Sequence, residues 1–549
     1  MLISCIAAVI LGQTAESAGI MILFSVGDLF EFGAVNNSRK LVNDLKKLRV
    51  DKATLIDNDG SERVVSPNEV EVGSVILVKA GEKIAIDGVI VEGNANIDTK
   101  NVTGESVYLE GGVGVNVSSG CVVVDGALKI KTTRLYEDSA VSKIVDIVES
   151  ASKEKSKSEK FITKFAKYYT PIIVIVAVLI TFIPPFFSAS YKSGLFIWLE
   201  RAVMLLCISC PCALVLSVPL TYFCANGSAA KNGVLIKSSE RLESLAKCDT
   251  IAFDKTGTLT TGEFSVTKII STKKFTGKVL DYCAICEKNS NHPIAKSILK
   301  KYGKEVEGSI TDHREIAGRG VMVNYNGSTI ICGNAKLLNE NGIEFKQVDE
   351  LGVKLYVAVD NEFAGVVILN DTLRDTARGC ILELYDAGVK NTVMLTGDNK
   401  EYAVAVRKEL NMRQSVSELL PEDKVTEIER LIQENNNAVA FVGDGVNDAP
   451  CLSRADVGIA MGGLGSDLAV DSADIVLTDD DLSKIPYAIK LAKRTNSIAK
   501  QNIIMSIGVK AIVLLLAVTG LVSSLWLAIS ADVGVMILAV LNAIRNAKK

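Results

Sequence analysis

Long apolar runs constrain this chain more than any other feature, because runs of this kind fold as helices inside a lipid bilayer. A helix needs about 20 mostly apolar residues to cross the hydrocarbon core. The runs come in pairs separated by short polar breaks: 1–12, 20–35, 169–187, 195–224, 502–521 and 525–544. The mean hydropathy of +0.29 is also too high for an ordinary soluble enzyme of 549 residues. We therefore predict an α-helical transmembrane bundle with six segments, arranged as three hairpins.

The distribution of Lys and Arg predicts which side of the membrane each segment occupies. The breaks 13–17 and 523–524 contain neither residue, and 188–194 contains only Lys192, whereas the long connecting segments are rich in both. By the positive-inside rule the long segments are cytosolic. A soluble protein with buried core helices is the alternative, and it would need this charge asymmetry to arise by accident. We expect a multi-pass integral membrane protein.

Composition excludes several classes of function. Sixty Lys and Arg residues against 64 Asp and Glu residues give a net charge of −4, so there is no basic field to hold a nucleic acid. Two histidines are too few for a site built from a histidine cluster. Twelve cysteines in a chain of this length are far below the density of a disulfide scaffold, and we interpret them as reduced thiols.

The two long polar segments differ in their patterns. Residues 50–133 are rich in Val, Ile and Gly with short alternating stretches, which predicts a small β domain. Residues 226–500 instead contain continuous apolar runs, at 250–253, 391–395 and 438–442, that each end in acidic or hydroxyl residues. Such runs are typical of buried parallel strands, whose carboxyl ends meet at one edge of a sheet.

The residues that follow these strands form a candidate site for a phosphate and a hard cation. Carboxylates suit Mg²⁺, while amides and a lysine suit phosphoryl oxygens. The candidates are Asp254, Lys255, Thr396, Asp398, Lys424, Asp444, Asn447 and Asp448. The chain has no Gly-x-x-x-x-Gly-Lys-Ser/Thr motif, so a carboxylate nucleophile, Asp254, is the device we expect. An ordinary polar turn at Asp254 is the alternative, which three such strand ends in order disfavour.

Five motifs together resemble those of P-type ATPases of the heavy-metal branch. The resemblance covers essentially the whole chain, and the motifs occur in the family's order. They are Thr103-Gly-Glu-Ser106, Cys210-Pro-Cys212, Asp254-Lys-Thr-Gly-Thr-Leu-Thr260, His292-Pro293 and Gly443-Asp-Gly-Val-Asn-Asp-Ala-Pro450.

The resemblance implies a domain plan in which a β-rich actuator domain and an α/β phosphorylation domain of the haloacid dehalogenase type lie in the cytosol. An α/β nucleotide-binding domain is inserted into the phosphorylation domain. The expected boundaries are a hairpin at 1–40, the actuator domain at 41–150, a juxtamembrane helix and the second hairpin at 151–225, the phosphorylation domain at 226–260 and 371–495, the nucleotide-binding domain at 261–370, and the last hairpin at 496–549.

The resemblance also implies roles for individual residues, with ATP and Mg²⁺ as cofactors. Asp254 would be phosphorylated, and Mg²⁺ would be held by Asp254, Asp444 and the carbonyl of Thr256. Glu105 would position the water that hydrolyses the phosphoenzyme. The remaining expected residues are Lys255, Thr396, Lys424, Asn447 and Asp448 around the phosphoryl group, and Glu287, His292, Gly318, Gly320, Asn334 and Asp398 around the nucleotide.

Cys210 and Cys212 predict a site for a soft metal ion, because Pro211 interrupts the helix between them in the middle of an apolar run. A kink with two packing cysteines is the alternative. Lys510 and Asp532 are ionisable residues within apolar runs, where such groups are expensive and commonly functional. Two thiolates and a carboxylate suit Zn²⁺, Cd²⁺ or Pb²⁺ better than Cu⁺, and Lys510 would be a counter-charge. A Cu⁺ transporter remains the alternative.

Other features have weaker interpretations. Cys283-x-x-Cys286 predicts core packing rather than a metal site, and Glu16 and Asp28 line an exit path or solvate helix ends. The first apolar run is short, and the family's usual soft-metal domain is absent, so the sequence resembles a chain truncated at its N-terminus. A phosphatase-like hydrolase and a non-transporting metal-binding fragment stay open as alternatives. We expect a monomer in a bacterial plasma membrane.

Overall fold

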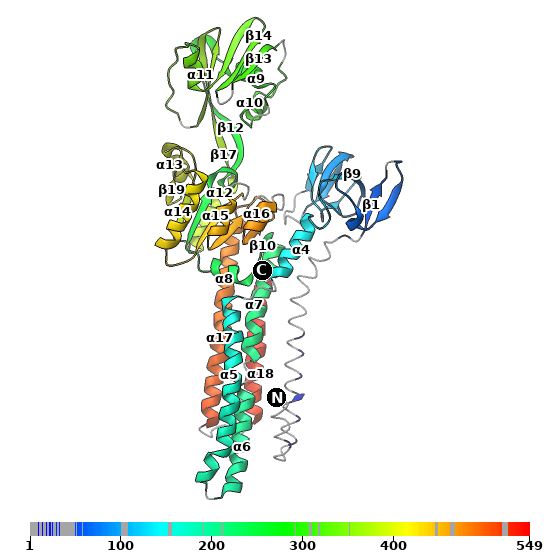
Figure 1. The fold of residues 1–549 in the computed structure, drawn as a ribbon, viewed down its shortest axis with the longest axis vertical. Coiled ribbons are helices and arrows are strands. Elements are labelled where there is room, and N and C mark those ends of the chain that lie inside the picture. Colours follow the sequence, from blue (N-terminus) through cyan, green and yellow to red (C-terminus); the bar gives the residue numbers. More distant parts are fainter. Residues whose placement is uncertain are drawn as a thin grey trace. The chain divides into compact units, whose positions relative to one another are not determined.

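The structure is a computed structural model of the chain (Figure 1). It describes residues 50, 52–57, 59–99, 108–151, 156–188, 190–209, 212–290, 293–306, 310–316, 319–350, 352–444, 448–461, 467–518 and 525–548, with isolated positions between 9 and 32. The predicted hairpin at 1–40 lies outside this description, as do Glu16 and Asp28. The chain forms two compact units, one of residues 1–249, 432–440 and 449–549 and one of residues 250–431 and 441–448.

The β domain of the first unit contains two antiparallel sheets. The larger has the strand order β2-β1-β3-β9-β4-β7, and the smaller has the order β6-β5-β8. The strands are β1 (Ala53–Ile56), β2 (Glu62–Val65), β3 (Val75–Lys79), β4 (Gly88–Glu92), β5 (Ala95–Asp98), β6 (Tyr108–Gly111), β7 (Asn116–Val117), β8 (Val122–Val123) and β9 (Ala127–Thr132), with a 3-10 turn η1 at Pro67–Glu69. Ile76 lies opposite Ile130 and Val78 opposite Leu128, and all four side chains are buried. Strand alternation therefore produces one apolar face, as the sequence predicts.

The same unit contains the helices that the apolar runs predict. They are α5 (Lys157–Phe182), α6 (Tyr191–Ile208), α7 (Cys212–Lys231), α17 (Lys484–Val518) and α18 (Leu525–Ile544), with α4 (Ala140–Ala151) before them and the 3-10 turns η2 (Pro184–Phe187) and η6 (Arg545–Lys548). Among the described residues, the helices at Ser158–Phe187, Ala213–Lys231 and Lys484–Leu516 are long and apolar enough to cross a membrane, and Ser530–Ile544 is a shorter apolar helix. The Ser156 hydroxyl and Glu159 carboxylate form a capping box that fixes where α5 begins.

Two of the expected domain boundaries fall inside the apolar helices α7 and α17. Helix α7 continues to Lys231, beyond residue 225, and α17 begins at Lys484, before residue 496. The reason is that α7 continues without a break from apolar into polar sequence, and α17 from polar into apolar sequence. A change in composition therefore does not mark the end of a helix here.

Asparagine side chains join α17 to α18 and to the turn η6 near one end of the bundle. Asn502 donates to the carbonyl of Ala539 at 3.1 Å, and Asn542 donates to the Asn502 side chain at 2.9 Å. The buried Asn546 donates to the Thr495 hydroxyl at 3.1 Å. Buried amides that lose a partner are costly, so these bonds fix the relative register of α17 and α18.

Three strands and three short helices of the first unit lie in sequence between α7 and α17. The strands are adjacent in the order β10-β22-β21. Their bounds are β10 (Val234–Ile236), β21 (Val457–Ala460) and β22 (Ile475–Leu477), and the helices are α8 (Ser239–Leu245), α15 (Ala449–Arg454) and α16 (Asp467–Ser472).

The second unit contains the parallel strands that the sequence predicts. Strands β20, β11, β18 and β19 are adjacent in that order, and β11 pairs with β18 in parallel with Asp254 opposite Leu395. The elements are β11 (Thr250–Asp254), the turn η3 (Lys255–Leu259), α12 (Asp375–Asp386), β18 (Asn391–Leu395), α13 (Lys400–Glu409), β19 (Gln414–Val416), α14 (Pro421–Glu434) and β20 (Val439–Gly443). Every residue of β11 is buried, which is why its sequence is a continuous apolar run.

A second sheet of this unit is inserted after β11 and contains two long strands that lead into and out of it. Its order is β12-β17-β16-β15-β14-β13. The elements are β12 (Thr260–Ser271), η4 (Lys273–Phe275), α9 (Val279–Glu287), α10 (Pro293–Tyr302), β13 (Ile310–Ile316), β14 (Gly320–Tyr325), β15 (Ser328–Gly333), α11 (Ala335–Glu340), β16 (Val353–Val359) and β17 (Glu362–Leu373). Figure 1 shows β12 and β17 running side by side between the two sheets, where Thr260 lies opposite Leu373.

Candidate catalytic and transport sites

Asp254 ends the buried strand β11, and the chain then turns sharply. Only 5% of Asp254 is exposed. The turn needs Gly257, whose φ of +76° is a left-handed conformation that other residues adopt at a cost. Arg374 holds the turn by donating to the carbonyls of Gly257 and Thr258, each at 3.0 Å. The carboxylate is therefore presented at the carboxyl edge of the sheet by a fixed loop.

Lys424 lies between two buried carboxylates. Its Nζ atom is 2.5 Å from Asp254 Oδ1 and 3.0 Å from Asp448 Oδ1. Helix α14 supplies the lysine, β11 supplies Asp254, and Asp448 follows the loop after β20. Charge-assisted hydrogen bonds of this kind are the strong ones in proteins. Three segments distant in sequence thus converge on one ammonium group, as the strand-end pattern predicts.

The electrostatic balance of this cluster is negative. Burial, and then the charge of Asp448, raises the pKa of Asp254 to about 6, although Lys424 opposes the shift. Burial also raises the pKa of Asp448. For Lys424, burial lowers the pKa, but Asp254 and Asp448 outweigh burial and raise that pKa above its usual value. One lysine does not neutralise the carboxylates around it, and a cation would complete the balance.

Asp444 brings another carboxylate to the same loop. A Cβ atom built on Gly257 would lie 2.9 Å from Asp444 Oδ2, so glycine is the residue that permits this approach. Asp254, Asp444 and the carbonyl of Thr256 offer oxygen donors, which fit a hard cation such as Mg²⁺. In the described parts of the chain no three His, Cys, Asp or Glu side chains are arranged to hold a metal. The carbonyl and a bound phosphate would have to complete the coordination.

A second polar cluster adjoins Asp254. It joins the predicted residues Lys255 and Asp398 to Asp371, which sequence reasoning missed. Lys255 Nζ lies 2.6 Å from Asp398 Oδ2 and 3.8 Å from Asp371 Oδ2. The Thr260 hydroxyl donates to Asp371 Oδ2 at 2.7 Å. Burial raises the pKa of Asp371, although the bond from Thr260 opposes the shift. The signal in the sequence was available, because the apolar run 366–369 in β17 ends in Asn370 and Asp371, like the strand ends that we did identify.

This second cluster opens into a cavity of about 220 Å³. Tyr402 contributes its ring, 5.0 Å from Lys255 Nζ, and burial followed by the charges of Asp371 and Asp398 raises the pKa of Tyr402 to about 12. The phenol is therefore a neutral hydrogen-bonding group at physiological pH. The cavity is lined by Lys255, Thr256, Phe264, Gly352, Val353, Leu369, Asn370, Asp371, Asp398, Asn399 and Tyr402. Lysine, amide and hydroxyl groups beside Asp254 suit the phosphates of a nucleotide.

The structure places the other sequence-predicted residues of this unit as follows. Thr396 is buried directly after β18, and its hydroxyl accepts from the backbone N–H of Asp398 at 3.1 Å. Glu287 is buried at the end of α9. Asn334 caps α11 by accepting from the N–H of Leu337 at 3.1 Å. His292, Gly318 and Asn447 lie outside the described residues, as does Glu105 in the first unit.

The structure explains why glycine occupies position 320, which the sequence alone did not show. Its φ is +147°, and a Cβ atom there would lie 2.2 Å from the carbonyl oxygen of Cys332 on the neighbouring strand β15. Glycine therefore permits a close approach of two backbones. This explains the residue type at that position whether or not a nucleotide binds nearby.

Three cysteines of the inserted segment, two on α9 and one on β15, pack together in its core. Cys283, Cys286 and Cys332 are fully buried, and the sulfur atoms of Cys283 and Cys332 are 3.6 Å apart. Burial raises the pKa of Cys283, so its thiol is protonated. Buried thiols behave as small apolar groups, which agrees with the packing role expected for Cys283 and Cys286.

Within the helix bundle, Lys510 of α17 contacts Asp532 of α18. The distance between Lys510 Nζ and Asp532 Oδ1 is 2.8 Å, and the two side chains are 18% and 19% exposed. Cys210 lies outside the described residues, and Cys212 begins α7 with its side chain outside the description. Helix α7 packs against α17 and α18. The two ionisable residues predicted to share a cavity therefore form an ion pair.

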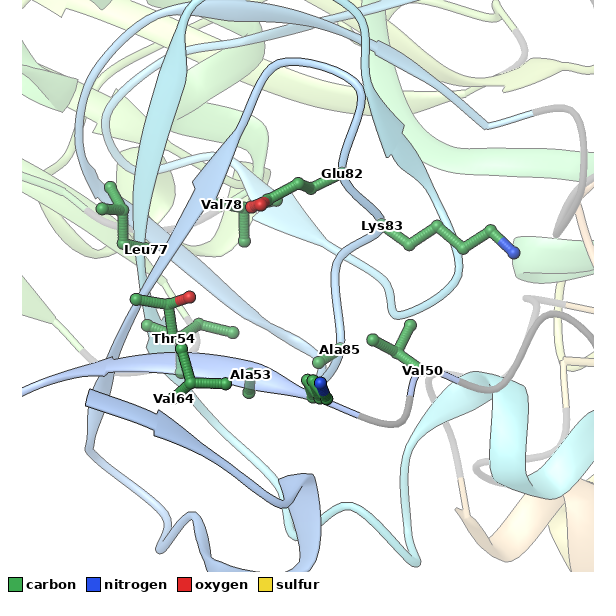
Figure 2. A pocket seen from close by; sticks show the side chains of 11 residues that line it. Val50, Ala53, Thr54, Val64, Leu77, Val78, Glu82, Lys83 and Ala85 are labelled. Atoms are coloured by element: carbon green, nitrogen blue, oxygen red, sulfur yellow. The ribbon is translucent and has the colours of Figure 1, made fainter. Parts of the chain in front are cut away.

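The β domain contains a cavity of a different character. It has a volume of about 480 Å³ and is lined by apolar and polar residues of β1 to β3, of the segment 82–85 and of the residues before β1. Figure 2 shows the Lys83 side chain pointing away from Ala53 and Ala85, and Glu82 lying beside Val78. Ligand sites usually combine an apolar wall with convergent polar groups. We assign this cavity no role in catalysis.

Comparisons with known proteins match this organisation. Residues 248–456 match the family described as haloacid dehalogenase-like hydrolase, and residues 47–149 match the P-type ATPase actuator domain. A cadmium, zinc and cobalt-transporting ATPase of Bacillus subtilis is 45% identical over 99% of this chain and 78% of its own length. A zinc-transporting ATPase of Synechocystis sp. is 43% identical over 100% of this chain and 76% of its own length.

A solved structure has the same fold. The crystal structure of a zinc-transporting PIB-type ATPase in the E2.Pi state is 34% identical, with a TM-score of 0.64, over 99% of this chain and 89% of that chain. The predicted fold class, a helical membrane bundle with a β-rich actuator domain and a haloacid dehalogenase-like domain, is confirmed.

Proposed function

Because this chain belongs to the heavy-metal P-type ATPases, we propose that it exports Zn²⁺, Cd²⁺ and Pb²⁺ through a membrane by way of an aspartyl phosphate on Asp254. The observation that carries the catalytic half is the ammonium of Lys424 held between Asp254 and Asp448 at the edge of a parallel sheet. The observation that carries the transport half is the ion pair of Lys510 and Asp532 between apolar helices.

The first chemical step belongs to Asp254. One carboxylate oxygen attacks the γ-phosphorus of ATP, the bond to ADP breaks, and an acyl phosphate forms. Lys424 lies within hydrogen-bond distance of that carboxylate, so it can orient the attacking oxygen and stabilise charge on the phosphoryl group. Mg²⁺, when bound by Asp254, Asp444 and the Thr256 carbonyl, would neutralise phosphate charge.

Neighbouring residues would orient the phosphates of ATP and the water molecule that later hydrolyses the acyl phosphate. Lys255 is held by Asp398 and lines the cavity, where it would contact the phosphates of ATP. Thr396 and Asn447 would hold the phosphoryl oxygens. Glu105 would orient the water that attacks the phosphorus of the acyl phosphate and would accept a proton from this water. The bond between phosphorus and the Asp254 oxygen then breaks, inorganic phosphate leaves, and the carboxylate is regenerated. Glu287, His292, Gly318 and Gly320 would surround the nucleotide.

The transported ion would be held by Cys210, Cys212 and Asp532. Two soft thiolates and a carboxylate favour borderline divalent ions over Cu⁺, which prefers sulfur donors without a carboxylate. The ion must displace Lys510 from Asp532, and the return of the lysine would help to release the ion. We expect the chain to work in this way in a bacterial plasma membrane, as a monomer.

ATP turnover of the purified chain, titrated separately with Zn²⁺, Cd²⁺, Pb²⁺ and Cu⁺, tests the proposal. The three divalent ions should stimulate turnover, and Asp254→Asn should abolish it. Asp386→Asn, an exposed aspartate at the end of α12, is the matched control and should retain turnover. Stronger stimulation by Cu⁺ would overturn the divalent assignment, and turnover that ignores every metal would favour a simple hydrolase.

A further inference from the structure

A cavity of about 270 Å³ lies beside Lys510 in the helix bundle. Its wall is mostly apolar, but it includes the hydroxyls of Ser209 and Ser506, which are 6% and 1% exposed. Neither hydroxyl has a hydrogen-bond partner in the described part of the structure. The lining residues are Phe165, Tyr169, Ser209, Leu214, Ser506, Ile507, Lys510, Ala511 and Leu514.

Ser506 and Lys510 share one face of α17. They are four residues apart, which places their Cβ atoms about 5–6 Å from each other. Side chains on a helix lean towards its N-terminus, so the lysine stem leads from residue 510 towards residue 506. The ammonium of Lys510, now 2.8 Å from Asp532, can therefore rotate about its own stem into the cavity that Ser506 lines.

Binding of a transported ion would leave the Lys510 ammonium without its carboxylate partner, and the nearby hydroxyls can replace that partner. The proposed function requires the ion to take the Asp532 carboxylate, and the ammonium must then leave its partner. An ammonium without acceptors inside the apolar bundle is expensive. It carries three donors, and a serine hydroxyl offers two lone pairs as an acceptor. Burial of a hydroxyl without a partner is itself unfavourable, so Ser506 gains from receiving the lysine.

We propose that Ser506, supported by Ser209, is a positioning residue that receives the Lys510 ammonium when the transported ion occupies Asp532. Ser209 directly precedes Cys210, so one of the two acceptors lies next to an expected metal ligand. Lys510 then has two sites: the carboxylate in the ion-free state and the hydroxyls in the ion-loaded state. This inference rests on the proposed roles of Lys510 and Asp532.

Cd²⁺ affinity of the detergent-purified full chain tests the inference by a double-mutant cycle. Ser506→Ala should weaken Cd²⁺ binding about tenfold, because the loss of one hydrogen bond to a charged group changes a binding constant by about that factor. Lys510→Ala removes the competing ammonium and should bind Cd²⁺ at least as tightly as the native chain. Adding Ser506→Ala to Lys510→Ala should then have no further effect, because no ammonium needs an acceptor.

Two further variants separate this role from packing. Ser506→Thr keeps the hydroxyl and should keep near-native affinity. Ser217→Ala removes another fully buried hydroxyl without a described partner, on α7 and outside the cavity, and should leave affinity unchanged.

Unchanged affinity in Ser506→Ala overturns the inference, as does an equal loss with and without Lys510. If Asp532→Ala binds Cd²⁺ as tightly as the native chain, the proposed transport site itself is wrong, which is a separate result.

Discussion

Lys424 Nζ lies 2.5 Å from Asp254 Oδ1, so the proposed nucleophile is held in place by a cation from another element, helix α14. The same cation also contacts Asp448. Removal of Lys424 would leave two buried carboxylates without their common partner, which is a costly arrangement. Lys424 thus orients the proposed nucleophile and also stabilises the fold by compensating two buried carboxylates.

Replacement of Lys424 by Met should therefore reduce phosphoenzyme formation by about 10²- to 10³-fold, a value typical of losing one stabilising donor. The rate of label transfer from γ-labelled ATP measures this loss. Lys408→Met, at an exposed position near the end of α13, should retain the native rate. A native rate in Lys424→Met would contradict the role given to Lys424.

Gly257 and Gly262 provide a matched pair of substitutions. Both have left-handed backbones, with φ of +76° and +73°, but a Cβ atom meets Asp444 only at Gly257, and the nearest atom at Gly262 is 3.9 Å away. Backbone strain alone should be similar in Gly257→Ala and Gly262→Ala. Displacement of Asp444 should lower turnover at least tenfold more in Gly257→Ala, measured at saturating Mg²⁺ and again across a Mg²⁺ titration. Equal losses in both variants would assign the effect to strain.

The raised pKa of Asp254 predicts how stability depends on pH. The folded protein holds a proton on Asp254 up to about pH 6, whereas the ordinary pKa of 3.8 applies to the unfolded chain. Stability from this proton is complete below about pH 4 and is lost as pH rises to about 6.

Thermal unfolding of the ATP-free protein between those pH values measures this loss. Stability of the native chain should decline over the interval relative to Asp254→Asn, which has no titrating group at that position. Asp386→Asn should behave like the native chain. If the stability of Asp254→Asn and of the native chain changes with pH in the same way, the proton on Asp254 does not contribute to stability.

Glu105→Ala should trap the phosphorylated protein. The nucleophile is intact in this variant, so label from γ-labelled ATP should form and then persist, because the water lacks its positioning group. Hydroxylamine should release the label, as expected of an acyl phosphate. Glu110→Ala, an exposed glutamate on β6, should lose label at the native rate. Failure of Glu105→Ala to form label at all would refute this division of roles.

Asp532→Ala should abolish stimulation of turnover by divalent ions. The substitution removes the oxygen ligand and leaves Lys510 without its partner between apolar helices. Metal-stimulated ATP hydrolysis measures the loss, with Gln501→Ala on the exposed face of α17 as the control. Full Zn²⁺ stoichiometry and stimulation in Asp532→Ala would exclude the carboxylate as a ligand.

Sequence reasoning predicted that the candidate catalytic residues lie together, because strand ends in a parallel sheet converge. Apolar runs ending at Asp254, Thr396 and Gly443 predicted neighbours correctly, and β11 indeed pairs with β18. The apolar runs likewise predicted the helices that hold Lys510 and Asp532, although not the 2.8 Å contact between them.

Contacts that depend on long-range pairing were not predictable in the same way. Asp371 reaches Thr260 across more than a hundred residues, through the pairing of β12 with β17. The Cys332 thiol contacts the Cys283 thiol only because β15 packs against α9. A single sequence shows the period of each element, but it does not show which elements meet.

Helix α17 extends without interruption from Lys484 to Val518. At 1.5 Å per residue, Lys484 is about 39 Å from Lys510 along the helix axis. An unbroken helix over that distance acts as a stiff lever, so rotation of its polar end turns the ammonium of Lys510 through the same angle. A flexible joint placed midway would let one end of the helix turn while the other stays still. ATP hydrolysis would then proceed without transport of the metal ion.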